Sequence, residues 1–369
     1  MSNLTGATVC PESVAEVAQC VLAHSRLKIV GAATKSAMVH HEPNVTPMSL
    51  KSIAGIVDHQ PSEFLITALA GTTIDEMQTE LAKFGQYLPF DPPFAAQGAT
   101  IGGTVAAGLS GAGRLRYGGL RDFIVGIRIV DGLGNVVTGG GRVVKNAAGY
   151  DLPKLMVGSA GYLAAIVEVT LKVFPRPTDH CTLQIDLGSF EEAFALVKHF
   201  ARSPIELAAM DLTPDGVIWL RVDGAENAIE ATTQRVRQIL ARLDIKATPS
   251  VVHDDVAVWG PLADGTFASQ EERFVRVPTS PAQLMDVEVS LGELCVRRRY
   301  SVAGNLAWIA WPVARPIQQL DDCLRHHGLG GTVLTGDVVR YRVGTRPHAS
   351  MMARVKLAMD PDGRFDGCA

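Results

Sequence analysis

The first 90 residues alternate between helical and strand spacing of their apolar positions. Behind Pro11, apolar side chains recur three or four residues apart, which predicts a first helix. The apolar positions of this helix are Val14, Val17, Ala18, Val21 and Leu22. An apolar run at 27–30 predicts a short buried strand, and runs at 53–57 and 64–69 predict two more.

A second helix is predicted after residue 72. Thr73 and Glu76 have the spacing of a capping box, in which each residue binds a free N–H group of the first turn. Apolar residues continue at helical spacing from Ile74 to Phe84. Gly85 then favours the left-handed conformation that ends a helix.

From residue 122 the apolar pattern changes to a period of two, which is typical of a strand with one buried face. Phe123, Val125, Ile127 and Ile129 share one face, and the glycines in 131–135 predict the turn that follows. The run at 167–173 repeats this alternation, with Glu, Thr and Lys on the opposite face. The prolines at 175 and 177 end this part of the chain and mark a domain boundary.

The rest of the chain contains two similar sets of predicted elements. The first set has a strand at 183–187, a helix at 189–202, strands around 207–222 and a helix at 225–243. The second has a strand at 274–277, a helix after Pro281, strands around 299–311 and a helix at 316–327. Two such β-α-β-β-α sets are typical of one antiparallel sheet covered by helices. The fold class is therefore predicted as α+β, with a last helix at 351–361.

Length and composition set the number of domains and exclude some partners. A chain of 369 residues suits two domains, because a single core stops growing near that size. We expect a first domain at 1–177, a second at 178–345, and a C-terminal segment at 346–369 that docks on the first domain. Apolar residues at 47% and charged residues at 20% are typical of a soluble globular protein. A net charge of −4 without a long basic run argues against nucleic acid as a partner.

The cysteines and histidines predict no metal site. The six cysteines include no Cys-x-x-Cys pair, and no secretory signal precedes them, so we expect reduced thiols in the cytoplasm and no iron–sulfur cluster in this chain. The histidine pairs at 40–41 and 326–327 lack the spacing of a helical zinc site. The uncharged stretch at 92–113 has the length of a membrane span, but its Gly, Pro and Thr residues predict a loop followed by a turn.

Two glycine-rich segments are candidate phosphate-binding loops. Residues 31–36, Gly-Ala-Ala-Thr-Lys-Ser, follow the first predicted strand, where successive N–H groups can surround a diphosphate. They do not form a Walker loop, because Thr34 replaces the required glycine. Residues 98–103 offer a second close backbone approach with one hydroxyl at Thr100. The glycines at 111 and 113 do not continue into a Rossmann motif. A flavin site is favoured, and an ordinary strand-to-loop turn is the alternative for 31–36.

A third segment runs from 145 to 161. Asp151 is predicted to cap a helix that begins at 152, and Gly158 is predicted to end it. Lys145 or Asn146 would also suit a hydrogen bond to a flavin carbonyl.

Together these segments resemble the FAD-binding domain of the vanillyl-alcohol oxidase/PCMH flavoprotein superfamily. Within it, residues 88–93, 145–151 and 355–365 are similar to the FAD-binding subunit family of glycolate oxidase. The resemblance implies a PCMH-type FAD-binding domain of two subdomains, followed by an α+β cap domain with an antiparallel sheet. It also implies noncovalent FAD, because no histidine stands near Thr34 and Lys35, where covalently flavinylated relatives carry one.

The resemblance further implies which residues contact FAD. The residues expected at the pyrophosphate are Gly31, Ala32, Ala33, Thr34, Lys35, Gly98, Thr100, Gly102 and Gly103. The residues expected beside the flavin are Ser110, Gly113, Tyr117 and Gly118. Ile166 and Val167 are expected to close on the flavin through backbone groups.

No residue matches a catalytic base of the superfamily. Ala160, Tyr162 and Ala164 stand where catalytic relatives often have Glu, Thr and Gly. Residues 301–306 lack the histidines of the His-Gly-Asp-Gly-Asn-x-His element found in catalytic caps. Oxidation of a 2-hydroxy acid requires a base for the hydroxyl proton, so the catalytic residues stay unassigned.

The resemblance therefore implies the FAD-binding subunit of a glycolate oxidase complex, which supports oxidation of glycolate to glyoxylate. Its expected partners are a larger flavin-containing subunit and an iron–sulfur subunit. Contact with the inner face of the cell membrane is expected only through that complex.

Two alternatives stay open. A self-sufficient FAD-dependent 2-hydroxyacid dehydrogenase would use the arginines at 297–299 for the substrate carboxylate and Tyr300 or a cap histidine as base. In the simpler interpretation those arginines lie at a solvated strand end. A flavin-free scaffold subunit would keep the fold without the cofactor.

Overall fold

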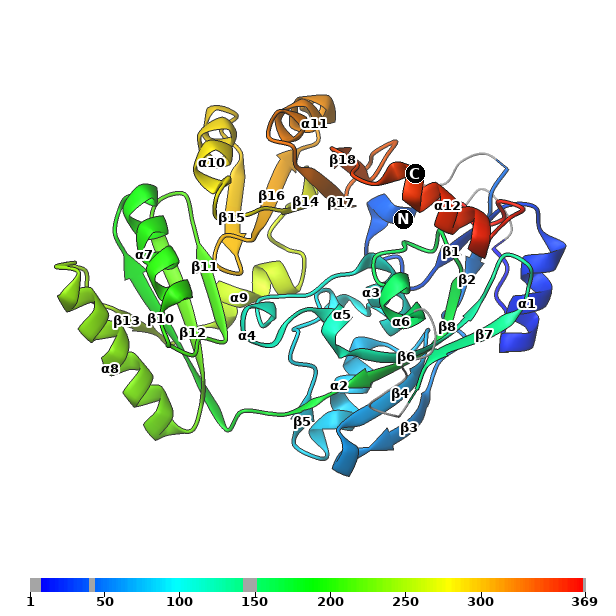
Figure 1. Ribbon diagram of the computed structural model, residues 1–369, viewed down its shortest axis with the longest axis horizontal. Helices are drawn as coiled ribbons and strands as arrows, with labels where there is room; N and C mark the ends of the chain where they lie inside the picture. Colours follow the sequence, from blue (N-terminus) through cyan, green and yellow to red (C-terminus); the bar gives the residue numbers. More distant parts are fainter. Residues whose placement is uncertain (1–7, 40–43, 142–150, 368–369) are drawn as a thin grey trace. The chain divides into compact units, whose positions relative to one another are not determined.

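A computed structural model describes residues 8–39, 44–141 and 151–367 (Figure 1). The chain divides into two compact units. The first consists of Met1–Ser110, Gly119–Pro175 and Arg346–Ala369, and the second of Gly111–Gly118 and Arg176–Thr345. Each unit combines helices with largely antiparallel sheets, which confirms the predicted α+β class.

The first unit contains a five-stranded antiparallel sheet in the order β3-β4-β8-β6-β7. A parallel pair, β1-β2, and a short antiparallel pair, β5-β9, lie outside it. The strands are β1 Leu27–Val30, β2 Thr46–Ser49, β3 Ile56–Gln60, β4 Leu65–Leu69, β5 Gln86–Tyr87, β6 Ile124–Val130, β7 Val136–Gly140, β8 Ala165–Lys172 and β9 Phe174–Pro175. The strand expected at 53–57 begins three residues later, because Ile53 is buried in the turn before it and accepts the N–H of Gly71.

The helices of the first unit follow their capping residues. They are α1 Val14–Ala23, α2 Ile74–Ala82, α3 Ile101–Ala107, α5 Leu120–Phe123, α6 Leu152–Met156 and α12 Ala349–Met359, with 3₁₀ turns η1 Ser36–Val39, η2 Pro61–Glu63 and η3 Ala95–Gln97. The capping box of α2 is confirmed, since the Thr73 hydroxyl accepts the N–H of Glu76 and the Glu76 carboxylate accepts the N–H of Thr73. Asp151 caps α6 by accepting the N–H of Lys154, as predicted. Ser13 caps α1, and Pro11 precedes the helix instead of lying in its first turn.

The prediction of a loop and turn throughout 92–113 is wrong. Residues 101–107 form α3, which packs on β4 and β8. The small side chains of this helix let it approach the sheet closely, and such tertiary packing outweighs the low helix propensity of glycine. No helix in the described ranges has both the length and the apolar character needed to cross a membrane.

The main core of the first unit joins distant parts of the chain. Val17 and Val21 of α1 pack with Leu27 of β1, Val167 of β8 and Phe365 near the C-terminus, and all five side chains are at most 1% exposed. This core places the end of β1, and the loop that follows it, beside β8.

The second unit contains a nine-stranded antiparallel sheet in the order β13-β10-β12-β11-β15-β16-β14-β17-β18 (Figure 1). Its strands are β10 Asp179–Asp186, β11 Ala209–Leu212, β12 Val217–Gly224, β13 Ser250–Val252, β14 Glu272–Pro278, β15 Arg297–Ser301, β16 Leu306–Pro312, β17 Gly330–Thr335 and β18 Arg342–Gly344. Its helices are α4 Arg114–Tyr117, α7 Phe190–Arg202, α8 Glu226–Arg242, α9 Val256–Ala263, α10 Leu284–Glu293 and α11 Ile317–His326.

The predicted duplication within this sheet is confirmed. Each set has one more strand than the predicted β-α-β-β-α pattern, β13 in the first set and β17 in the second. The strands lie in the same spatial order in both sets, β13-β10-β12-β11 and β17-β14-β16-β15. The two sets meet where β11 pairs with β15, at Leu212 and Tyr300. The helices α7 and α8 pack on strands of the first set, and α11 packs on β17 and β18.

Candidate functional site

The first unit contains a pocket beside the end of β1. Its walls come from the loop after β1, from α3, and from the segment that leads into β8. Its free space, including the open solvent at its mouth, is about 720 Å³. The lining residues are Ile29, Val30, Gly31, Ala32, Ala33, Thr34, Lys35, Met38, Val39, Leu50, Ala70, Thr100, Gly102, Gly103, Ala106, Ala107, Ala160, Gly161, Ala164 and Ile166.

The loop after β1 presents backbone donors to this pocket. In the described part of the chain, the N–H groups of residues 32–35 have no hydrogen-bond partner. Ala33 holds a φ of 57°, a left-handed conformation that turns the chain sharply at this point. Unpaired N–H groups on a concave turn can bind an anion, so this loop fits a phosphate group.

Lys35 adds a buried positive charge to the loop. Its side chain is 7% exposed, and its Nζ donates to the Thr34 hydroxyl at 2.9 Å and lies 5.3 Å from the centre of the Phe94 ring. Among the described residues, no carboxylate forms an ion pair with Lys35. Burial lowers the pKa of Lys35 to about 8. An ammonium group buried without a counter-charge fits a site that receives an anion.

The glycines of α3 matter more for the close packing they allow than for their N–H groups as hydrogen-bond donors. The Thr100 hydroxyl caps this helix by accepting the N–H of Gly103, and the N–H of Gly102 donates to the carbonyl of Ala70. A Cβ atom at Gly102 would lie 2.6 Å from the Cβ of Ala70. Glycine at this position therefore allows α3 to pack against β4 and its following turn.

Gly31 and Thr100 are in close contact across the pocket. A Cβ atom at Gly31 would lie 2.5 Å from the Thr100 hydroxyl oxygen. We expect Gly31→Ala to destabilise the protein by about 1–3 kcal/mol through this overlap, and Thr100→Ala by about 1 kcal/mol through the lost cap. Because Thr100→Ala also removes the overlapping oxygen, the double variant should lose less than the sum of the two. Urea denaturation of the three variants measures this, and strict additivity would contradict the contact.

The pocket brings together most of the residues expected at a pyrophosphate. Residues 31–35, Thr100, Gly102, Gly103 and Ile166 line it. Gly98, Ser110 and Val167 belong to the same unit but do not line it. Ser110 accepts the N–H of Leu120, and Val167 points into the main core. Gly113, Tyr117 and Gly118 belong to the second unit. Lys145 and Asn146 lie outside the described residues. The expected FAD contacts of all these residues stay predictions.

Sequence reasoning missed the alanine-rich part of the pocket. Ala106 and Ala107 lie one helical turn after Gly103, so the helical period of α3 would have placed them on the same side. Ala160 and Ala164 were identified only as departures from catalytic relatives, and Gly161 only as the end of the segment at 145–161. Ala160 has a φ of 54°, which bends the chain into the pocket wall.

The solvated strand end of the simpler interpretation holds only for Arg297, the exposed first residue of β15. The arginines at 297–299 alternate along β15, and each guanidinium group is paired with a carboxylate: Arg297 with Glu272, Arg298 with Glu288 and Arg299 with Asp211. Arg299 is 5% exposed, so its charged group lies in the interior of the second unit.

Tyr300 also has a partner within the chain. Its hydroxyl donates to Glu288, and burial together with the charge of Glu288 raises the pKa of Tyr300 above its usual range. A raised pKa keeps the Tyr300 hydroxyl protonated, so it is not available to accept the proton of a substrate. In the described ranges, no three His, Cys, Asp or Glu side chains are grouped so that they could hold a metal ion.

Comparison with protein families identifies the part of the chain that contains most of the pocket residues. Residues 5–140 match the model of an FAD binding domain, and this range includes the loop after β1 and all of α3. This part of the chain is therefore an FAD-binding domain.

Curated relatives match about half of the chain or less. It is 39% identical over 180 residues to glycolate oxidase subunit GlcE of Escherichia coli, covering 49% of this chain and 51% of that protein. It is 34% identical over 141 residues to a D-lactate dehydrogenase of Archaeoglobus fulgidus, covering 38% of this chain and 32% of that enzyme. The matched region thus spans about half or less of the length of these relatives.

Solved structures resemble the chain over nearly its whole length. An alkyldihydroxyacetonephosphate synthase aligns with a TM-score of 0.72 at 16% identity, over 96% of this chain and 76% of that one. A p-cresol methylhydroxylase with substrate bound aligns with a TM-score of 0.72 at 14% identity, over 97% of this chain and 88% of that one. At these identities the likeness establishes the fold, and it includes the second unit.

Proposed function

We propose that this chain, whose residues 5–140 form an FAD-binding domain, is the FAD-binding subunit of a glycolate oxidase complex. It would hold noncovalent FAD in the pocket of the first unit and support oxidation of glycolate to glyoxylate. Its partners would be a larger flavin-containing subunit that oxidises the substrate and an iron–sulfur subunit that passes electrons onward. The complex would act in the cytoplasm, at the inner face of the cell membrane.

The observation that carries this proposal is the agreement between the family match and the pocket. The matched range contains a loop with unpaired N–H groups, the buried Lys35 and a helix whose glycines permit close approach. These features suit the diphosphate of FAD. When bound, FAD supplies the electron acceptor for a two-electron oxidation. The 39% identity to the E. coli subunit GlcE supports the choice of glycolate.

The direct test is to purify the chain alone and with its proposed partners. We expect the isolated chain to show flavin absorption bands, to release FAD on denaturation, and to turn over little glycolate. Turnover should appear only when the two partner subunits are added. Rapid glycolate oxidation by the isolated chain would contradict the subunit role. Absence of bound FAD after incubation with excess FAD would contradict the cofactor and favour the scaffold alternative.

One observation favours the self-sufficient dehydrogenase as a second candidate. Arg276 on β14 has a buried Nε atom without a hydrogen-bond partner among the described residues. Burial, with a smaller effect from Arg114, lowers the pKa of Arg276 to about 10. Arg276 has no carboxylate partner among the described residues, whereas each arginine of β15 has one, so Arg276 is the better candidate to pair with a substrate carboxylate. Loss of glycolate turnover by an isolated Arg276→Met variant, against active isolated wild type, would support this candidate.

A further inference from the structure

We propose that the C-terminal segment, residues 349–367, holds two walls of the FAD pocket in position, with Lys356 as the positioning residue. The inference rests on the proposed binding of FAD by this chain. It assigns a binding role to a segment that begins 209 residues after the matched FAD binding domain ends.

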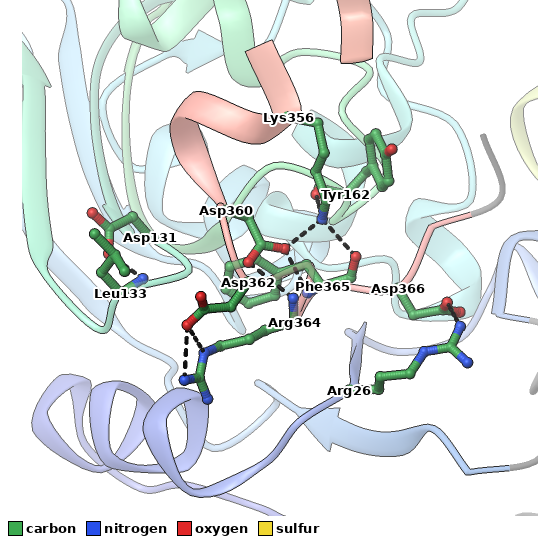
Figure 2. Close-up of polar contacts among 10 residues, drawn as sticks. All are labelled: Arg26, Asp131, Leu133, Tyr162, Lys356, Asp360, Asp362, Arg364, Phe365 and Asp366. Carbon is green, nitrogen blue, oxygen red and sulfur yellow. Dashed lines mark hydrogen bonds and ion pairs between the residues drawn. The ribbon is translucent and has the colours of Figure 1, made fainter. Parts of the chain in front are cut away.

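Lys356 fastens the C-terminal segment to the pocket wall that leads into β8 (Figure 2). Its Nζ donates to the carbonyl of Tyr162 at 2.6 Å, to the carbonyl of Phe365 at 2.7 Å and to the Asp360 carboxylate at 2.5 Å. The Tyr162 ring lies 4.2 Å from the same nitrogen. These three acceptors use all three N–H bonds of the ammonium group, so its direction is defined.

Asp360 makes this attachment rigid. Its carboxylate is buried, and besides Lys356 it accepts the backbone N–H groups of Arg364 and Phe365. Figure 2 shows these contacts converging on one carboxylate at the end of α12. The carbonyl of Met359 also accepts the N–H of Gly132, in the turn after β6. The position of Lys356 is therefore set by both its own segment and the sheet.

The same segment is also hydrogen-bonded to β1, which leads into the other wall of the pocket, the loop after β1. Phe365 forms a parallel bridge with Leu27, since the N–H of Leu27 donates to Arg364 and the N–H of Asp366 donates to Leu27. This places the chain around Phe365 beside β1, whose last residues continue directly into the pocket loop. Arg26 also pairs with Asp366 at 2.5 Å (Figure 2).

At the pocket the two walls approach each other closely at Gly161 and Ile29. Tyr162 lies between Gly161 and Ala164, which line one wall, and a Cβ atom at Gly161 would lie 3.2 Å from Ile29 of the other wall. A shift of Tyr162 would move its neighbours Gly161 and Ala164, and with them this wall of the pocket. Because FAD binds the positioned walls, FAD binding and docking of the segment must strengthen each other by the same factor.

The test compares Lys356→Met with wild type. We expect the variant to bind FAD about tenfold more weakly in titrations that follow quenching of FAD fluorescence. We also expect saturating FAD to slow trypsin cleavage after the exposed Arg354 of α12 in wild type, and to give much less protection in the variant. Lys83→Met, which removes an exposed lysine of the same unit, is the matched control and should behave as wild type.

The outcomes separate this inference from the proposed function. A purely structural role would lower the thermal midpoint of Lys356→Met but leave its FAD affinity and trypsin protection at wild-type values, and that result would overturn the inference. Failure of wild type to bind FAD would instead refute the proposed cofactor. If Lys356→Met does not fold, Gly367→Ala displaces the same wall, because its Cβ would lie 2.7 Å from the Tyr162 ring. It should weaken FAD binding, and unchanged affinity would equally overturn the inference.

Discussion

Replacing Asp211 with alanine is expected to destabilise the second unit by about 3–5 kcal/mol. Asp211 is 1% exposed, and its Oδ2 accepts Arg299 Nε at 2.7 Å and the Ser301 hydroxyl at 2.8 Å. Without this carboxylate, the Arg299 guanidinium would stay buried against the rings of Trp219 and Trp259 with no counter-charge. Urea denaturation followed by tryptophan fluorescence should show a large decrease in the unfolding midpoint.

Two further variants distinguish the buried pair from surface charge. Arg297→Met breaks a more exposed ion pair with Glu272 and should cost less than about 1 kcal/mol. The double variant Asp211→Leu, Arg299→Met removes both buried charges and should recover much of the loss, because apolar side chains need no counter-charge. A decrease below about 1 kcal/mol for Asp211→Ala would show that Arg299 does not depend on this carboxylate.

Replacing Lys35 with methionine is expected to weaken FAD binding by about 10- to 100-fold at pH 7. The buried ammonium group is the one lysine nitrogen that lines the pocket in the described part of the chain, and an anionic diphosphate would pair with it. Methionine keeps the length of the side chain and removes the charge. Isothermal titration of the FAD-free protein measures the change, and Lys83→Met is the control for a lost surface charge.

The pH dependence gives a second measurement at Lys35. Because its pKa is about 8 in the folded protein, the ammonium form dominates below pH 8 and the affinity of wild type for FAD should decrease as the pH rises above 8. Lys35→Met should lack this decrease. In the FAD-free protein, the unfolded chain holds the proton up to its higher pKa, so the Lys35 contribution to stability should rise by about 3 kcal/mol between pH 8 and 10.5. Identical pH profiles for wild type and Lys35→Met would contradict the assignment.

Much of the fold followed from local rules. The capping box at Thr73 and the cap at Asp151 depend on residues three positions apart, so the sequence alone was sufficient to predict them. The predicted period-two runs at 123–129 and 167–173, which correspond to β6 and β8, depend on one buried face, and the duplicated sets of the second unit depend on the order of elements. These features require no knowledge of distant contacts.

Distant contacts explain what could not be predicted. The helix α3 forms in a glycine-rich sequence because it packs on a sheet whose strands lie on both sides of it in the chain. The pairing of Arg299 with Asp211 joins residues 88 positions apart, so the cluster at 297–299 looked like surface charge. The pocket loop was recognised from its glycine and its strand, but the burial of Lys35 was visible only in three dimensions.

The pairing of Leu27 with Phe365 has a consequence for synthesis of the protein. The ion pair beside it joins residues 340 positions apart, and closing such a loop requires nearly the whole chain. Residues 176–345 of the second unit form one uninterrupted stretch and can fold while translation continues. The first unit lacks the bridge to β1 until residue 365 has left the ribosome. Loading of the cofactor should therefore wait until long after the loop that receives the cofactor has been made.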